Sequence, residues 1–259
     1  MINRYASLRQ GLVGCWVPSL GASGYRLIDR SGNNNHGVLT GMDPGTDWVP
    51  SGGKLALDFD GSNDYVTATS PQIGQLTKNI SVSIWQNLGA TGRIASLFGL
   101  NTVSSINERM QAHCPWSDGV IYWDFGGYAG DNRLSVSGQN LTVGNWDHFV
   151  FLAGDIGMQI WRNGRLIGSN STPITRVANS NTFLIGSANM HDQQGVIYYH
   201  LGRIDDVRLY NRVLTASEIR LLYTGGRGVG LAPERIKHRR KTSAAATNRR
   251  RRIICGANC

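Results

Sequence analysis

Strict alternation of apolar and polar side chains, the pattern of half-buried β-strands, recurs along the chain. The clearest case is the ISVSIW stretch of residues 80–85, and residues 55–59 follow the same period of two. Glycine, asparagine and proline separate these stretches, and Asn163-Gly164 has the composition of a two-residue hairpin turn. The pattern predicts an all-β fold in which many short strands form a two-sheet antiparallel sandwich.

The expected strands span nearly the whole chain up to the last helix. They are placed at residues 12–16, 38–39, 55–59, 65–68, 80–85, 93–100, 119–125, 146–153, 158–161, 165–168, 182–186, 196–199 and 202–210. Residues 42–53 are rich in glycine and proline and are expected to form a loop.

The last strand carries polar residues on both of its expected faces. Simple alternation puts Ile204, Asp206, Arg208 and Tyr210 on one face and Asp205, Val207 and Leu209 on the other. One of the two aspartates is expected to accept hydrogen bonds from the amides of a nearby loop.

A short helix is expected directly after this strand. Thr215 and Glu218 have the spacing of a capping box, in which each side chain bonds to the backbone of the other residue. Ile219, Leu222 and Tyr223 then recur at helical spacing and give the helix one apolar face.

Three motifs resemble those of laminin G-like domains of the concanavalin A type. They are GLVGCW (residues 11–16) followed by DRSGNNNHG (29–37), LDFDGSNDYV (57–66), and GRIDDVRLYNRVLTASEI (202–219). They occur in the order of that family. The resemblance implies a jelly-roll sandwich with a short C-terminal helix, and it does not fix a function, since one fold hosts many. We expect an N-terminal arm at residues 1–10, the sandwich at 11–225 and a basic C-terminal arm at 226–259.

The positive charge is concentrated at the C-terminal end. The chain has a formal net charge of +9, yet residues 226–259 alone hold ten of the 26 Lys and Arg residues and one of the 17 acidic residues. The predicted sandwich is therefore neutral and the arm strongly cationic. The arm residues assigned to assembly or polyanion binding are Arg235, Lys237, Arg239, Arg240, Lys241, Arg249, Arg250, Arg251 and Arg252.

Features of export and membrane insertion are absent from the sequence. The first ten residues lack the apolar stretch and cleavage site of a secretory signal, so we expect no signal-dependent export. No apolar run reaches the roughly 18 residues of a membrane span. An extracellular or cell-surface location would then require a non-classical route.

The four cysteines do not form a metal motif. Cys15 lies in an apolar stretch and is expected to be a buried thiol, although a disulfide with Cys114 remains an alternative. Cys255 and Cys259 lack the additional ligands of a zinc site and are expected to be free or intermolecular thiols.

The motifs of hydrolases are also missing. Retaining glycosidases need two carboxyl groups about 5–5.5 Å apart, and the Glu-x-Asp-x-x-Glu pattern of sandwich glucanases does not occur. The chain has three glutamates, Glu108, Glu218 and Glu234, none of them in a predicted strand. No Gly-x-Ser-x-Gly elbow is present. We therefore expect a protein without catalytic activity.

A calcium site is one binding hypothesis. Oxygen ligands cluster around one turn, at Asp58, Asp60, Asn63 and Asp64. The alternative, which we favour, is that these side chains hold the turn by bonding their own backbone.

Carbohydrate binding is a second hypothesis. Lectins stack sugars on exposed aromatic rings and hold hydroxyl groups with Asn and Asp. One rim of the sandwich could supply this with Trp116, Tyr122, Trp123, Tyr128, Asp131 and Asn132, and another loop carries His191, Asp192 and Gln193. The alternative is that most of these aromatic residues pack in the core or at sheet edges.

The function we favour from sequence is structural: a virion surface protein of the capsid decoration type, from a bacteriophage. Its sandwich would face outward, and its arm would bind capsid proteins within an oligomeric assembly. Carbohydrate binding by an adhesion module is the alternative function. The third possibility is sequence-independent binding of nucleic acid by the arm, which contains no aromatic residue for base stacking.

Overall fold

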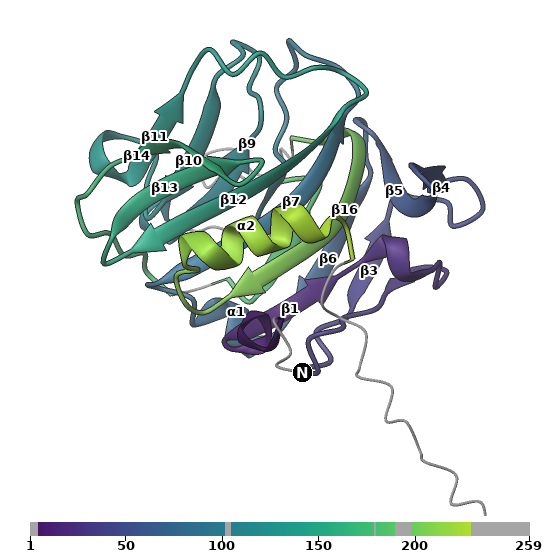
Figure 1. The fold of residues 1–259 in the computed structure, drawn as a ribbon, viewed down its shortest axis with the longest axis horizontal. Helices are drawn as coiled ribbons and strands as arrows, with labels where there is room; N and C mark the ends of the chain where they lie inside the picture. The colour runs from purple at the N-terminus through teal and green to yellow at the C-terminus, as the bar shows by residue number, and fades with distance from the viewer. Residues whose placement is uncertain (1–4, 102–104, 179, 190–197, 229–259) are drawn as a thin grey trace, which may run out of the picture.

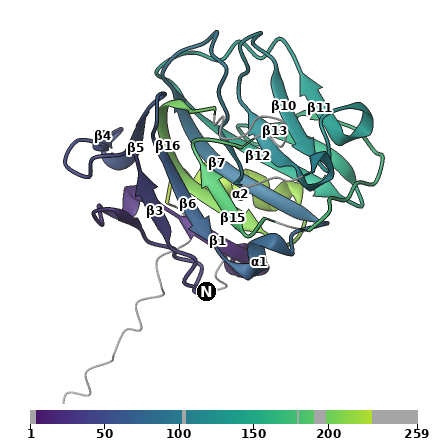
Figure 2. The same ribbon diagram turned by 180° about the vertical axis from the view of Figure 1, so that it is seen from behind.

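The computed structural model describes residues 5–101, 105–178, 180–189 and 198–228. Two large antiparallel sheets pack face to face, and one helix lies on the outer face of one of them (Figures 1 and 2). The predicted two-sheet antiparallel sandwich with a short C-terminal helix is confirmed.

The first sheet, sheet A, carries the helix. Its strands run in the order β14 (Arg165–Ser169), β13 (Gly157–Arg162), β12 (Trp146–Gly154), β7 (Ile80–Leu88), β16 (Leu201–Tyr210), β5 (Lys54–Asp60) and β4 (Trp48–Ser51), and β1 (Leu12–Trp16) also pairs with β16.

The second sheet, sheet B, forms the other layer of the sandwich. Its order is β11 (Arg133–Val136), β10 (Ile121–Phe125), β9 (Met110–His113), β8 (Phe98–Leu100), β15 (Thr182–Ile185), β6 (Tyr65–Thr69), β3 (Gly37–Thr40) and β2 (Arg26–Leu27). The helical segments are η1 (Ala6–Arg9), η2 (Pro18–Leu20), α1 (Pro71–Gly74), η3 (Ile106–Glu108), η4 (Gly130–Asn132) and α2 (Ala216–Gly225).

Aromatic rings fill the space between the sheets. Phe98 lies at the centre, with its ring centroid 5.7 Å from Trp123, 5.3 Å from Phe151 and 5.6 Å from Phe183. All four side chains are fully buried. These contacts join strands of both sheets, so the main core holds the two layers together.

A second apolar cluster lies between α2 and sheet A. Ile219 and Leu222 of α2 are buried against strand residues that include Val150 and Trp161. The cluster also contains Leu8 of η1, so this N-terminal turn packs on the domain. The predicted capping box is confirmed: the Thr215 hydroxyl accepts from the Glu218 amide at 3.3 Å, and the Glu218 carboxylate accepts from the Thr215 amide at 2.9 Å.

Several strand predictions were wrong. Residues 42–53 do not form only a loop, because β4 lies within them; Pro50 is tolerated there since β4 is an edge strand. The strand expected at 93–100 begins only at Phe98. Strands β2, β9 and β11 were missed, although β9 and β11 have a period of two. Of the strand expected at 196–199, the described residues 198–199 are not in a strand.

The predicted faces of the last strand were wrong only before the bulge: Val207 and Leu209 share one face as expected, but Ile204 lies with them instead of with Arg208 and Tyr210. A β-bulge interrupts the register of β16 between Asp205 and Arg208, and Asp206 has a φ of 46°. The extra residue restores the inward direction at Val207, so Ile204, Val207 and Leu209 all belong to the main core. Tyr210 lies on the opposite side, in the cluster with α2, and Arg208 is buried on the same side.

The bulge creates a buried site for the start of the C-terminal segment. Arg227 Nη1 lies 3.3 Å from the Asp205 carboxylate, and its guanidinium stacks on Trp146 at 4.1 Å from the ring centroid. The Arg227 guanidinium also donates to the Ser51 carbonyl, and the Gly228 amide donates to Asp206. These two residues, which the sequence assigns to the arm, are therefore held on sheet A.

The two cysteines within the described residues are both free and buried, so the Cys15–Cys114 disulfide alternative was wrong. Burial raises the pKa of both thiols well above the usual range. Cys255 and Cys259 lie outside the described residues. No helix in the part of the chain that the structure describes combines the length and hydropathy of a membrane span.

Candidate functional site

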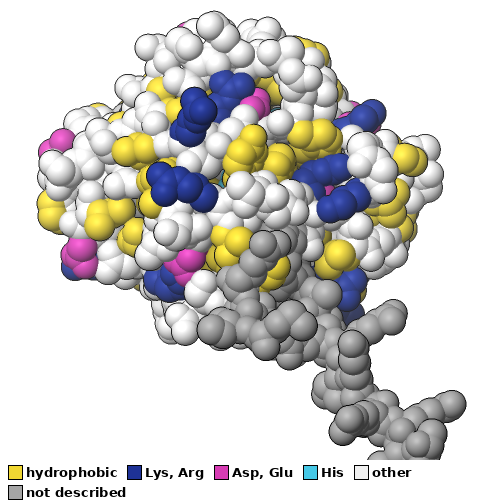
Figure 3. Space-filling view, viewed as in Figure 1, with side chains coloured by type: hydrophobic (Ala, Val, Ile, Leu, Met, Phe, Trp, Pro, Cys, Tyr) yellow, Lys and Arg dark blue, Asp and Glu magenta, His cyan; other side chains and the backbone are white. Residues whose placement is uncertain are grey.

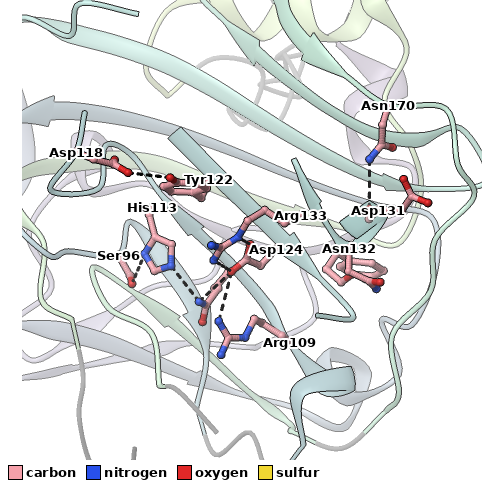
Figure 4. A network of polar contacts seen from close by, with 12 residues as sticks. Ser96, Arg109, His113, Asp118, Tyr122, Asp124, Asp131, Asn132, Arg133 and Asn170 are labelled. Carbon is pink, nitrogen blue, oxygen red and sulfur yellow. Dashed lines mark hydrogen bonds and ion pairs between the residues drawn. The ribbon is translucent and has the colours of Figure 1, made fainter. Parts of the chain in front are cut away.

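A groove of about 260 Å³ opens on the outer face of sheet B, where β9, β10 and β11 meet the loops that connect them (Figure 4). It combines aromatic with charged side chains. Its lining residues are Arg109, His113, Trp116, Asp118, Tyr122, Tyr128 and Arg133. We call it the sheet B groove.

Strand alternation and register bring these residues together. On β10, Trp123 points into the core, which leaves Tyr122 and Asp124 on the outer face. Asp124 lies opposite Gln111 on β9 and opposite Arg133 on β11, while Tyr122 lies opposite His113. Side chains opposite each other on neighbouring strands are close enough to interact, so the floor of the groove is built by pairing alone.

Asp124 is the centre of the floor and is fully buried. Arg133 donates to both of its oxygens, from Nε and Nη2, each at 2.7 Å. Arg109 Nη1 and Gln111 Nε2 approach the same carboxylate at 3.4 and 3.3 Å (Figure 4). Buried charges need such partners, and the set fixes both guanidinium groups in place.

His113 extends the network as a neutral side chain. Its Nδ1 lies 3.0 Å from the Ala95 carbonyl, which can only accept, so Nδ1 carries the proton. Its Nε2 then accepts from Gln111 Nε2 at 3.0 Å. Burial lowers the pKa of His113 to about 4, even though the Asp124 charge acts in the opposite direction.

Aromatic rings form the walls. The Trp116 ring lies edge-on to His113, with 4.3 Å between centroids. Tyr122 and Tyr128 flank the Arg133 guanidinium at 4.6 and 5.7 Å. Tyr122 donates to Asp118 at 2.8 Å, and this hydrogen bond raises the pKa of Tyr122. The groove therefore offers flat apolar faces beside fixed polar groups, which is the make-up of a small-molecule site.

Three of the six residues predicted to bind a sugar line this groove: Trp116, Tyr122 and Tyr128. Trp123 does not, because it is fully buried between the sheets and donates to the Leu152 carbonyl at 2.9 Å. The prediction for Trp123 was wrong, since neighbouring strand residues cannot share a face.

The other two predicted residues lie to one side of the floor (Figure 4). Asp131 and Asn132 belong to η4; the Asn132 amide donates to the Phe125 carbonyl at 3.0 Å, and the Asp131 carbonyl accepts from Asn170. Neither lines the groove.

Four lining residues were missed in the sequence: Arg109, His113, Asp118 and Arg133. A signal was available for two of them, because recognising β9 and β11 by their alternation puts His113 and Arg133 on the same face as Tyr122.

Two of the proposed calcium ligands, Asp60 and Asp64, accept hydrogen bonds from amides of their own turn. Asp60 Oδ1 accepts from the amides of Ser62 at 2.7 Å and Asn63 at 3.3 Å, and Asp64 Oδ2 accepts from the Asp60 amide at 2.9 Å. Asp58 lies 3.7 Å from Arg203. Within the described residues, no three His, Cys, Asp or Glu side chains are grouped so that they could share a metal ion. Calcium at this turn stays a prediction.

Two other hollows in the described part of the chain lack such aromatic walls. One of about 420 Å³ is lined by residues that include Arg9, Asn33 and Gln72, and no aromatic side chain contributes to it. Another, of about 350 Å³, shares Asp118 with the sheet B groove and continues over Thr91, Pro115 and the loop at 138–141. The second could extend the sheet B groove for a longer ligand.

Two groups of predicted residues cannot be placed. The second loop, His191, Asp192 and Gln193, lies outside the described residues. So do all nine arm residues: Arg235, Lys237, Arg239, Arg240, Lys241, Arg249, Arg250, Arg251 and Arg252.

Residues 60–220 match the family model described as the concanavalin A-like lectin/glucanases superfamily. The match covers more than half of the chain and includes every residue that lines the sheet B groove. No curated protein matches the chain.

Solved structures with a similar fold come from several kinds of protein. The receptor-binding domain of botulinum neurotoxin C/D mosaic serotype has a TM-score of 0.60 at 16% identity, over 84% of this chain and 52% of that one. Trypanosoma rangeli sialidase has a TM-score of 0.57 at 16% identity, over 82% and 33%. Domain 4 of a GH43 extracellular arabinanase from Geobacillus stearothermophilus, solved with arabinotriose, has a TM-score of 0.53 at 18% identity, over 81% and 96%.

The chain thus spans about a third of the sialidase and half of the toxin domain. At these identities the likeness shows the fold alone.

Proposed function

The chain belongs to the concanavalin A-like lectin/glucanase superfamily, and on that premise we propose that it binds carbohydrate in the sheet B groove without catalysing a reaction. The observation that carries the proposal is the groove itself, where Trp116, Tyr122 and Tyr128 surround fixed polar groups. Sugar rings have apolar faces that pack on aromatic rings and hydroxyl groups that need hydrogen-bond partners, so they suit such a site.

The carboxyl groups of the groove do not have the arrangement that glycoside hydrolysis requires. Hydrolysis of a glycosidic bond requires an acid and a second carboxylate with access to the sugar. Asp124 is fully buried, and two arginines and Gln111 occupy its oxygens. Asp118 is exposed at the rim and lacks an accessible carboxyl partner among the described lining residues.

The arabinanase domain supports binding of carbohydrate as a role for this fold, because its structure contains arabinotriose. The match with this chain covers 96% of that domain, so the comparison concerns a module of similar size.

The proposal is tested on a glycan array, followed by calorimetry with the sugars that bind. Trp116→Ala and Tyr128→Ala are each expected to weaken binding by about tenfold or more, since each removes a stacking surface. Tyr25→Ala is the matched control, because Tyr25 is 64% exposed and lies outside the groove. Binding that survives both groove substitutions would place the sugar elsewhere, and saturable release of reducing ends would show catalysis.

A structural role on a virion, with the arm bound to capsid proteins, stays a second prediction. It is favoured by the separation of charge between a neutral sandwich and a cationic arm. Deletion of residues 229–259 distinguishes the two roles: it should abolish incorporation into a particle and leave glycan binding unchanged. If the full chain binds DNA in a salt-dependent manner and the same deletion weakens this binding, nucleic acid would instead be favoured as the partner of the arm.

A further inference from the structure

Arg133 is the one charged side chain of the groove that is both rigidly held and partly open to solvent. Its side chain is 29% exposed, while the Asp124 carboxylate that holds it is fully buried. The two 2.7 Å hydrogen bonds from Nε and Nη2 fix the plane of the guanidinium, and Tyr122 and Tyr128 flank it. A guanidinium positioned in this way loses little conformational freedom when it binds a ligand.

Part of the hydrogen-bonding capacity of Arg133 is unused. Its third nitrogen, Nη1, has no hydrogen-bond partner among the described residues. The single negative charge of Asp124 is also shared with Arg109, whose Nη1 lies 3.4 Å away. Arg133 therefore keeps a donor and part of its positive charge available to the groove.

The other ionisable groups around Arg133 do not cancel this charge at the floor. His113 is neutral at physiological pH because burial lowers its pKa to about 4. Asp118 is exposed at the rim, where its carboxylate accepts from the Val120 amide and the Tyr122 hydroxyl, each at 2.8–2.9 Å. Its field is screened by water, unlike that of groups at the floor.

We infer that the sheet B groove selects a carboxylated sugar, whose carboxylate binds Arg133 Nη1 while its ring packs on the aromatic walls. Arginine binds carboxylates through short, charge-assisted hydrogen bonds that a hydroxyl group cannot match. A neutral sugar would use the walls but leave Arg133 Nη1 without a charged partner. The inference rests on the proposed function and names the class of glycan.

The test compares carboxylated oligosaccharides with their neutral counterparts on the wild-type chain. The probes are oligomers of galacturonic, glucuronic, mannuronic and guluronic acid, each beside its carboxyl-reduced form, and sialyllactose beside lactose. At least one acidic probe should bind about tenfold or more tightly than its neutral counterpart. This preference should shrink as the salt concentration rises.

Arg133→Gln should remove the preference for the acidic probe while leaving weak binding through the walls. Arg220→Gln is the matched control, since Arg220 is an exposed residue of α2 on sheet A. Arg133→Gln also removes a partner of a buried carboxylate, so its fold is checked by thermal unfolding. If it does not fold, the wild-type pairs and the salt series still decide the question.

The failures of the two proposals are distinguishable. Equal or tighter binding of every neutral counterpart, lost in Trp116→Ala, would overturn the carboxylate inference and leave carbohydrate binding intact. No saturable binding of any acidic or neutral probe would overturn both.

Discussion

Asp205 is a carboxyl group whose surroundings disfavour its charge. It is fully buried, and burial together with the neighbouring Asp206 raises the pKa of Asp205 to about 7, despite the Ser19 amide and Arg227. Its Oδ1 accepts from the Ser19 amide at 3.0 Å, which confirms the predicted role in binding a loop amide. The folded state therefore holds a proton that the unfolded state has already released between about pH 4 and pH 7.

The contribution of Asp205 to the free energy of unfolding therefore falls as pH rises from about 4 to about 7, and it does not change further above pH 7. Asp205→Asn should remove this pH dependence. Between pH 4 and pH 7.5 the free energy of unfolding of the wild type should therefore fall by on the order of 2–4 kcal/mol relative to that of the variant. Urea unfolding of both proteins at each pH measures this difference. The comparison with the variant is needed because the lowered pKa values of His113, His148 and His200 act in the opposite direction. Parallel curves would contradict the assignment.

At the residue scale, the sequence identifies the chemical character of a side chain better than the face of the sheet on which it lies. Trp116, Tyr122 and Tyr128 could be selected because exposed aromatic residues suit sugars, yet Trp123 was selected with them for the same reason. Only the strand assignment separates Tyr122 from Trp123, and only the register brings Arg133 opposite Asp124. Arg133 was missed because β11 was not recognised as a strand, and its position opposite Asp124 depends on a register that neither strand specifies alone.

At the scale of elements, local signals predicted structure wherever one segment fixed its own geometry. The capping box of α2 needs only Thr215 and Glu218, and it is present as expected. The bulge of β16 depends on a positive φ at Asp206 and on the partners that surround it, so simple alternation put Ile204 on the wrong face. Strand β4 was hidden by Pro50, which only an edge position tolerates.

The capping box also predicts how strongly α2 is held. Thr215→Ala removes the acceptor for the Glu218 amide and should lower the free energy of unfolding by about 1 kcal/mol. Ser217→Ala is the control, since Ser217 is exposed and lies in the same first turn. Denaturant unfolding measures both, and an equal loss in the two variants would contradict a capping role. Arg212, which donates to Glu218 at 2.8 Å, keeps the carboxylate in place in either variant.

At the scale of the whole molecule, the two features of interest lie on different layers. The sheet B groove opens on one sheet, whereas Arg227 is held on the other, near α2. Figure 3 shows the α2 face, where Lys and Arg side chains occur in several separate groups among apolar and neutral ones. A ligand in the groove would therefore lie on the layer opposite the one that holds Arg227 and Gly228.

Arg227 is buried against sheet A by an ion pair, a hydrogen bond and a ring contact, so its removal should be costly. Arg227→Ala leaves the buried Asp205 carboxylate without its cation and should lower the free energy of unfolding by about 3–5 kcal/mol at pH 8.5. The loss should be smaller at pH 5.5, because Asp205 is then protonated and needs no counter-charge. Urea unfolding of the full chain at the two pH values measures both losses.

Arg220→Ala provides the control, as an exposed arginine on α2 that should change stability little at either pH. Carbohydrate binding by Arg227→Ala should equal that of the wild type under conditions where both are folded, because the groove belongs to sheet B. A pH-independent loss would mean that Arg227 acts through its packing on Trp146 and its bond to Ser51 rather than through Asp205. Loss of binding together with stability would instead show that the two sheets are coupled, so the groove and the C-terminal segment would no longer be independent.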